Sequence, residues 1–176
     1  DWLERLESNG VAVWNPVELA RWNMDKRYLR DLAARGISTV PRAWIPAAGD
    51  VDLGELMESG GWNDAVLKPV IAATSYRTVR VSRAGADRRV MEQGDAMLQP
   101  FVPQVAGEGE WSLVFLGGEY SHAVLKRPAA GDFRVQEEFG GSSRVAEAPD
   151  ALRESAAGVL AAVEHPWLYA RVDGVR

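Results

Sequence analysis

The sequence contains no cysteine, which excludes disulfides and thiolate metal sites. It has only two histidines, His122 and His165, too few for a histidine-rich metal centre. No run of about 18 apolar residues occurs, so no membrane-spanning helix is predicted. The first ten residues, DWLERLESNG, are charged and do not resemble a signal peptide. Together these absences predict a cytoplasmic protein that does not act at a membrane.

Lysine is also scarce. The net charge is −5, and only three of the 20 basic residues are lysines, namely Lys26, Lys68 and Lys126. The acidic balance argues against a nucleic-acid binder, which usually carries a basic surplus. A compact ammonium can be required where a guanidinium fork does not fit, so each lysine is a candidate functional residue. Chance retention in an arginine-rich composition is the alternative, and composition alone leaves both open.

The remaining composition is that of a folded globular protein, with 47% hydrophobic and 26% charged residues over 176 positions. Hydrophobic periodicity predicts helices, with Asn15 as an N-cap, over 1–9, 15–21, 25–35, 52–59 and 149–164. Alternation predicts strands over 11–14, within 37–45 near Val40-Pro41, and over 65–70, 78–82, 97–102, 111–116, 119–126, 133–138 and 167–175. Gly117-Gly118 between two alternating runs is a strong hairpin signal. Helices combined with a strand-rich middle indicate an α+β fold.

Lys68 lies in an otherwise apolar strand, AVLKPV, where a charge is costly unless it has an anionic partner or reaches water. The following loop, IAATSYRT, is a plausible phosphate cover, although it lacks the freedom of a glycine-rich loop. An edge lysine with its ammonium in water is the alternative. Further on, the segment QPFV (99–102) leaves a strand through a proline. Its free backbone groups would suit hydrogen bonds to the edge of a purine. An ordinary domain linker would have the same sequence features, so both interpretations stay open.

Three cations, Lys126, Arg127 and Arg134, fall within nine positions of the stretch KRPAAGDFRVQ, which we expect to form two joined strands. They either pair with carboxylates such as Glu137 and Glu138 or hold the phosphates of a ligand. In the last strand, LYARVDGVR, Asp173 falls on the polar side. A carboxylate near phosphate-directed cations suggests Mg²⁺, which binds one or two carboxylates plus phosphates, but a single aspartate is a weak signal.

In their order along the chain, these segments resemble the ATP-grasp ligases, the family that includes glutathione synthetase and D-alanine–D-alanine ligase. The segment NPVELARWNMDKRYLRDLAARGISTVPRAWI resembles the family's leading segment, and AVLKPV its phosphate-binding lysine strand. MLQPFV resembles the adenine hinge, and GEWSLVFLGGEYSHAVLKRP the following hairpin. GDFRVQEEFGG resembles the glutathione-synthetase-like branch, and LYARVDGVR the strand with the first magnesium carboxylate.

The resemblance implies two α+β subdomains that grip a nucleotide between them. Residues 1–38 would be the end of an N-terminal domain with leading helices, 39–98 the central subdomain, and 99–176 an incomplete C-terminal subdomain. ATP and Mg²⁺ are the implied cofactors. By the same resemblance, Lys26 and Lys68 would contact the ATP phosphates, and the backbone of Gln99, Phe101 and Val102 would contact adenine. Glu110 would lie near the ribose. The γ-phosphate and the acyl-phosphate would be contacted by Lys126, Arg127 and Arg134, and magnesium would be bound by Asp173.

The implied activity is an ATP-dependent ligase that joins a carboxylate to an amine or other nucleophile through an acyl-phosphate. Its partners would be small-molecule substrates, with no nucleic acid or membrane, and a homodimer is compatible with the family. Two departures stand out: the loop after Lys68 lacks glycines, and the strand with further metal ligands does not follow Asp173. We therefore expect a fragment trimmed at both ends. A non-catalytic nucleotide-binding module is the alternative, and a protein-binding domain with surface ion pairs is a third hypothesis.

Overall fold

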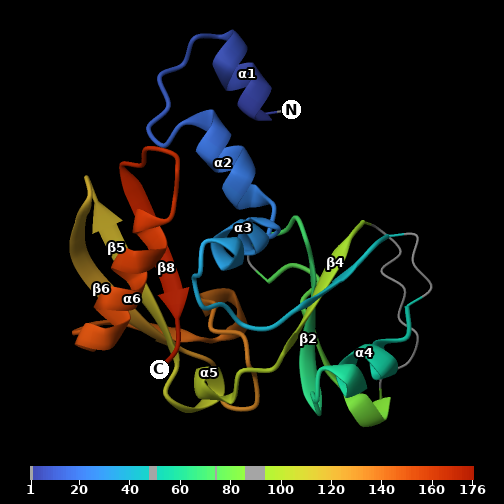
Figure 1. The fold of residues 1–176 in the computed structure, drawn as a ribbon. Helices are drawn as coiled ribbons and strands as arrows, with labels where there is room; N and C mark the ends of the chain where they lie inside the picture. Colours follow the sequence, from blue (N-terminus) through green and yellow to red (C-terminus); the bar gives the residue numbers. More distant parts are fainter. Residues whose placement is uncertain (1, 48–50, 74, 86–93) are drawn as a thin grey trace. The chain divides into compact units, whose positions relative to one another are not determined.

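The computed structural model describes residues 2–47, 51–73, 75–85 and 94–176 (Figure 1). The chain divides into two compact units. The central unit contains Asp25–Arg27 and Ser38–Pro103, and the terminal unit contains Asp1–Met24, Tyr28–Ile37 and Gln104–Arg176. Each unit has one antiparallel sheet and its own apolar core, which confirms the predicted α+β fold. The subdomain boundaries at 38 and 98 stay predictions.

The central unit is a four-stranded sheet covered on one face by a helix, α4 (Leu53–Ser59). Its strands run in the order β1-β4-β2-β3, with bounds Ala43–Ile45 (β1), Ala96–Pro100 (β4), Asp64–Pro69 (β2) and Val79–Ser82 (β3). Leu53 and Met57 of α4 belong to the same buried apolar cluster as Leu67 and Leu98 of the sheet. Asp52 caps this helix by accepting the Gly54 and Glu55 amides.

The terminal unit has the same two-layer design. Its sheet runs in the order β7-β6-β5-β8, with bounds Ser142–Ala146 (β7), Glu119–Arg127 (β6), Glu110–Leu116 (β5) and Tyr169–Gly174 (β8). The helix α6 (Asp150–Ala161) packs on one face, where Ala156 meets Trp111, Leu113 and Phe115. Gly117 and Gly118 form the predicted β5–β6 turn, both at positive φ.

The remaining elements are short helices. They are α1 (Trp2–Ser8), α2 (Val17–Met24), α3 (Tyr28–Ala34), α5 (Pro103–Gly107) and two 3₁₀ turns, Arg83–Gly85 and Glu137–Phe139. No helix within the described ranges is long and apolar enough to cross a membrane.

Several predicted elements are wrong. Residues 11–14 form no strand, and Trp14 is 79% exposed, so there is no sheet against which its apolar ring is buried. The short strand predicted within 37–45 is present as β1, but it lies at Ala43–Ile45 and does not include Val40-Pro41. Residues 133–138 are irregular and lead into a 3₁₀ turn, while β7 follows at Ser142.

Asn15 does not cap α2. Its φ is +70°, and its side chain contacts the start of β8 instead. The Asn15 amide oxygen accepts the backbone N–H groups of Leu168 and Tyr169 at 2.8 and 3.1 Å, and its NH₂ donates to the Tyr169 carbonyl at 2.7 Å. Asn15 therefore pairs with β8 in the way a neighbouring strand would.

Candidate functional site

Two predicted nucleotide contacts of the central unit share one sheet face. Ala65 and Leu67 of β2 point into the α4 core, so alternation places Lys68 on the opposite face, where it lies across from Met97. Gln99 lies across from Val66 on that same face. The central sheet therefore has a core face and a second face that carries Lys68 and Gln99.

Lys26 lies against the loop that follows β2. Its ammonium donates to the carbonyls of Pro69, Val70 and Ala72 at 2.9, 3.3 and 3.0 Å. The Lys26 backbone N–H also donates to Val70 at 3.1 Å. Burial lowers the pKa of Lys26, and the Asp25 carboxylate partly opposes this. Because an ammonium has three donors, a phosphate oxygen at Lys26 must displace a carbonyl.

The loop after Lys68 lacks glycine, yet two of its described residues lie in the left-handed region of the backbone. Ser75 and Arg77 have φ values of +56° and +52°, a region that favours glycine. Thr74 of the predicted phosphate cover lies outside the described residues. The loop thus adopts conformations suited to glycine with side chains that disfavour them.

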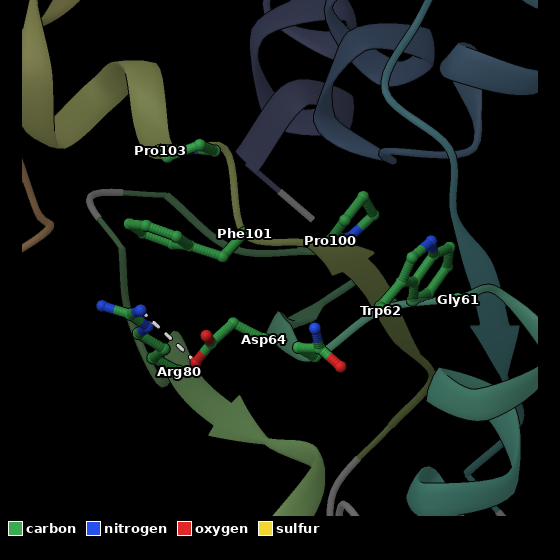
Figure 2. A pocket seen from close by; sticks show the side chains of 8 residues that line it. Gly61, Trp62, Asp64, Arg80, Pro100, Phe101 and Pro103 are labelled. Atoms are coloured by element: carbon green, nitrogen blue, oxygen red, sulfur yellow. Dashed lines mark ion pairs between the residues drawn. The ribbon is translucent and has the colours of Figure 1, made fainter.

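Phe101 lines a pocket of about 370 Å³ in the central unit (Figure 2). The Arg80 guanidinium lies 3.9 Å from the centre of the Phe101 ring and pairs with Asp64 at 3.3 Å. Trp62 and Pro100 contribute further apolar surface to the same pocket. Val102 follows β4 and is half-buried. A predicted adenine contact therefore borders a hollow with an aromatic ring and a cation.

In the terminal unit, three predicted site residues lie on the sheet face opposite α6. Glu110 of β5 lies directly across from Lys126 of β6, and their charged groups are 3.7 Å apart. Ser112, two residues along β5, lies directly across from Asp173 of β8. Alternation places Trp111 and Leu113 in the α6 core, so Glu110, Lys126 and Asp173 come together on the other face.

Both carboxylate oxygens of Asp173 already have partners. Arg171 donates from Nε to Oδ1 and from Nη2 to Oδ2, each at 2.9 Å. The Ser112 hydroxyl donates to Oδ1 at 2.5 Å. Arg171 has a raised pKa: burial opposes the shift, while the Asp173 hydrogen bond and charge drive it. The result is a small network of one carboxylate, one guanidinium and one hydroxyl.

No cluster of three or more His, Cys, Asp or Glu side chains within the described ranges could hold a metal ion. Mg²⁺ commonly takes one or two carboxylates and completes its shell with phosphate oxygens and water. The role of Asp173 as a magnesium ligand therefore stays a prediction, and within the described ranges its carboxylate is one oxygen donor group of the kind Mg²⁺ binds.

The structure separates the three clustered cations. Lys126 and Arg127 are consecutive in β6, so their side chains leave the strand on opposite sides. The Arg127 Nε donates to the Glu108 carbonyl at 3.0 Å. The predicted contact of Arg127 with a γ-phosphate stays a prediction, and Arg127 does not share the face that carries Lys126.

Arg134 is held by Asp132 rather than by a strand. Its Nη2 donates to Asp132 Oδ2 at 2.7 Å, and its guanidinium lies 3.7 Å from the centre of the Phe139 ring. Hydrogen bonds from the Arg134 side chain and backbone hold the pKa of Asp132 well below its usual range, and the pKa of Arg134 is raised. The predicted shared strand face with Gln136 is absent; Gln136 Oε1 is buried and has no hydrogen-bond partner.

Ser112 is the residue that sequence reasoning missed. Within the part of the chain that the structure describes, it is the only buried polar or charged residue, with 1% of its surface exposed. The available signal was a hydroxyl residue flanked by the apolar residues of the strand EWSLVFL.

The chain is similar in sequence to curated proteins, among them a cycloserine biosynthesis protein and a glutathione synthetase. The chain is 33% identical to the cycloserine biosynthesis protein DcsG of Streptomyces lavendulae over 129 residues, which are 68% of this chain and 43% of DcsG. It is 31% identical to a glutathione synthetase of Prochlorococcus marinus over 147 residues, 79% of this chain and 45% of that protein. The chain thus spans less than half the length of either relative. No protein-family model matches it.

Solved structures agree with the sequence comparison. The crystal structure of D-cycloserine synthetase DcsG matches 99% of this chain with a TM-score of 0.85 and 30% identity, and the match covers 64% of that chain. D-alanine–D-alanine ligase from Bacillus anthracis matches 99% of this chain and 60% of its own, with a TM-score of 0.75 and 21% identity. At that identity, the second match supports the fold alone.

Proposed function

Because the chain belongs to the ATP-grasp ligases, we propose that it is the ATP-binding part of a carboxylate–amine ligase. ATP-grasp ligases use ATP and Mg²⁺. The observation that carries the proposal is the match to DcsG over 99% of this chain. The arrangement of Glu110, Lys126 and Asp173 on one sheet face supports it.

The proposed reaction has two steps. A substrate carboxylate oxygen attacks the γ-phosphorus of ATP, the bond to the β,γ-bridging oxygen breaks, and ADP leaves. An amine then attacks the acyl carbon, inorganic phosphate leaves, and a proton departs from the nitrogen to give the amide. Neither step needs a covalent bond to the protein, so its contribution is positioning and neutralisation of phosphate charge.

The proposed roles are divided between the units. In the central unit, Lys26 and Lys68 contact the ATP phosphates, and the backbone of Gln99, Phe101 and Val102 contacts adenine. In the terminal unit, the ribose is near Glu110, the transferred phosphate is near Lys126, Arg127 and Arg134, and the metal ligand is Asp173. Mg²⁺, when bound, would neutralise phosphate charge and orient the phosphates.

The test is ADP release by the full-length protein with a panel of carboxylate substrates, with and without Mg²⁺. Hydroxylamine should intercept the acyl-phosphate and give a hydroxamate only when both the carboxylate and ATP are present. Lys68→Ala should weaken ATP binding. If the wild-type protein does not bind ATP, the nucleotide role is wrong, and the hypothesis of a protein-binding domain with surface ion pairs is favoured. If it binds ATP and Lys68→Ala binds equally well, the proposed role of Lys68 is wrong.

A nucleotide-binding module without ligase activity is the second candidate. Its support is that the donors of Lys26 and both oxygens of Asp173 are satisfied within the chain. The same experiment separates the two functions. ATP binding without ADP release or hydroxamate, across the whole panel of carboxylates, would favour the module.

A further inference from the structure

Asp173 has two partners with very different access to solvent. The Arg171 side chain is 47% exposed, whereas Ser112 is 1% exposed. An exposed guanidinium can leave a carboxylate and be solvated at once. A buried hydroxyl has no water to replace its bond, so leaving it unpaired would cost free energy. Of the two partners, Ser112 is the permanent one.

The Ser112 bond also has a fixed geometry. Ser112 and Asp173 are directly opposite residues of neighbouring antiparallel strands, so the sheet sets the separation of their backbones. The hydroxyl is 2.5 Å from Oδ1, as expected for an O–H donor on an ionised carboxylate. The Ser112 hydroxyl therefore holds Oδ1 from a position that is fixed by the sheet.

We propose that Ser112 is a positioning residue that holds the Asp173 carboxylate in the orientation needed to bind nucleotide-borne Mg²⁺. This inference rests on the proposed function. On binding, Arg171 gives up its bonds to Oδ1 and Oδ2, and the bond from Ser112 to Oδ1 stays. Hydrogen-bonded neighbours of metal ligands commonly set metal affinity by about 10- to 100-fold.

The test is ATP affinity of the full-length protein, measured by calorimetry in saturating Mg²⁺ and again in EDTA. Ser112→Ala should weaken ATP binding about tenfold or more in Mg²⁺ and leave binding in EDTA unchanged. Ser112→Thr, which keeps the hydroxyl, should retain most of the Mg²⁺-dependent affinity. The readout is the ratio of ATP affinity in Mg²⁺ to ATP affinity in EDTA, because a general destabilisation of the strand would lower both affinities.

Val114→Ala is the matched control. Val114 is buried on the same face of β5, two residues further along, and lies across from Arg171 rather than Asp173. It should lower stability while leaving the Mg²⁺ ratio unchanged. The inference would be overturned if Ser112→Ala left the ratio of ATP affinity in Mg²⁺ to that in EDTA unchanged. It would also be overturned if Val114→Ala lowered this ratio as much as Ser112→Ala does. Either result would leave the proposed function intact. A wild-type protein without Mg²⁺-dependent ATP binding would overturn both.

If Ser112→Ala does not fold, Ser112→Cys provides the same comparison with a weaker donor of similar shape. It should lose part of the Mg²⁺-dependent affinity that Ser112→Thr retains. Equal ratios for the Cys and Thr variants would contradict a role for the hydroxyl.

Discussion

Charged residues with a proposed ligand role already have partners within their own unit. Lys26 binds three carbonyls, Arg134 binds Asp132, and Asp173 binds Arg171 and Ser112. An exchange of partners is cheaper than exposure of an unpaired buried charge, since each group stays satisfied in both states. A ligand phosphate or metal ion therefore competes with intramolecular partners, and its net affinity is the difference between two sets of bonds.

Replacing Lys26 by Met should destabilise the central unit. The substitution leaves the carbonyls of Pro69, Val70 and Ala72 without the ammonium, at a cost of about 1–3 kcal/mol for unsatisfied groups. Urea unfolding measures this loss, and amide exchange should become faster in the loop after β2. Arg83→Met, an exposed cation of the same unit, should change neither quantity. Unchanged stability in Lys26→Met would mean that water replaces the ammonium at no cost.

The pair of Asp132 and Arg134 should contribute a pH-dependent stability. The pKa of Asp132 is lowered in the folded state, so its stabilisation is present above the ordinary aspartate value near 4 and is lost as acid protonates the folded carboxylate. The difference in unfolding free energy between wild type and Asp132→Asn should be constant above about pH 5 and shrink below about pH 4. Chemical denaturation across this range measures it.

Glu119→Gln is the control for Asp132→Asn, because Glu119 is an exposed carboxylate of the same unit. Its difference from wild type should vary little with pH. A difference for Asp132→Asn that stays constant down to pH 2 would contradict the assigned ion pair.

Elements with a strong local signal could be predicted from the sequence. The turn at Gly117-Gly118 and the alternation around it give β5 and β6 almost residue for residue. β7 was missed because its sequence, SSRVA, is polar and mostly exposed at a sheet edge, so no hydrophobic pattern marks it. The predicted strand at 133–138 failed because Asp132 accepts the backbone N–H groups of Phe133 and Arg134, which favours a turn.

In the candidate site too, features with a local sequence signal could be predicted and features that depend on distant residues could not. Alternation correctly separates the polar and core sides of the last strand, with Ala170 and Val172 against the core and Asp173 on the other face. It also implies that Lys126 and Arg127 diverge, which the family resemblance obscured. The hydroxyl of Ser112 is visible in its apolar surroundings, but its partner could not be predicted, because that depends on which strand lies beside β5, and the pairing joins residues 61 positions apart.

Asn15 ties the segment before α2 to the first residues of β8. Asn15→Ala removes three hydrogen bonds and leaves an alanine at φ +70°, where a Cβ is strained and no side-chain amide compensates. We expect the free energy of unfolding to fall by about 2–3 kcal/mol. Asn15→Gly relieves the backbone strain but not the missing bonds, so its loss should be smaller by about 1 kcal/mol. Urea unfolding compares the variants. Equal losses would show that the hydrogen bonds alone determine the effect.

At the scale of the whole molecule, each unit has its own sheet and core. Side chains with proposed ATP contacts occur in both units, Lys68 in one and Asp173 in the other. ATP with Mg²⁺ should therefore slow amide exchange in β2 of the central unit and in β5 of the terminal unit. Ligand at about 100 times its Kd stabilises a folded protein by about 2.7 kcal/mol, which is large enough to detect in either sheet.

Variants assign this protection to particular residues. Lys68→Ala should reduce the protection that ATP gives in Mg²⁺ and in EDTA, because its proposed partner is a phosphate. Asp173→Asn should reduce it only in Mg²⁺, because its proposed partner is the ion. Protection confined to the central unit in the wild type would contradict the proposed roles of Glu110, Lys126 and Asp173.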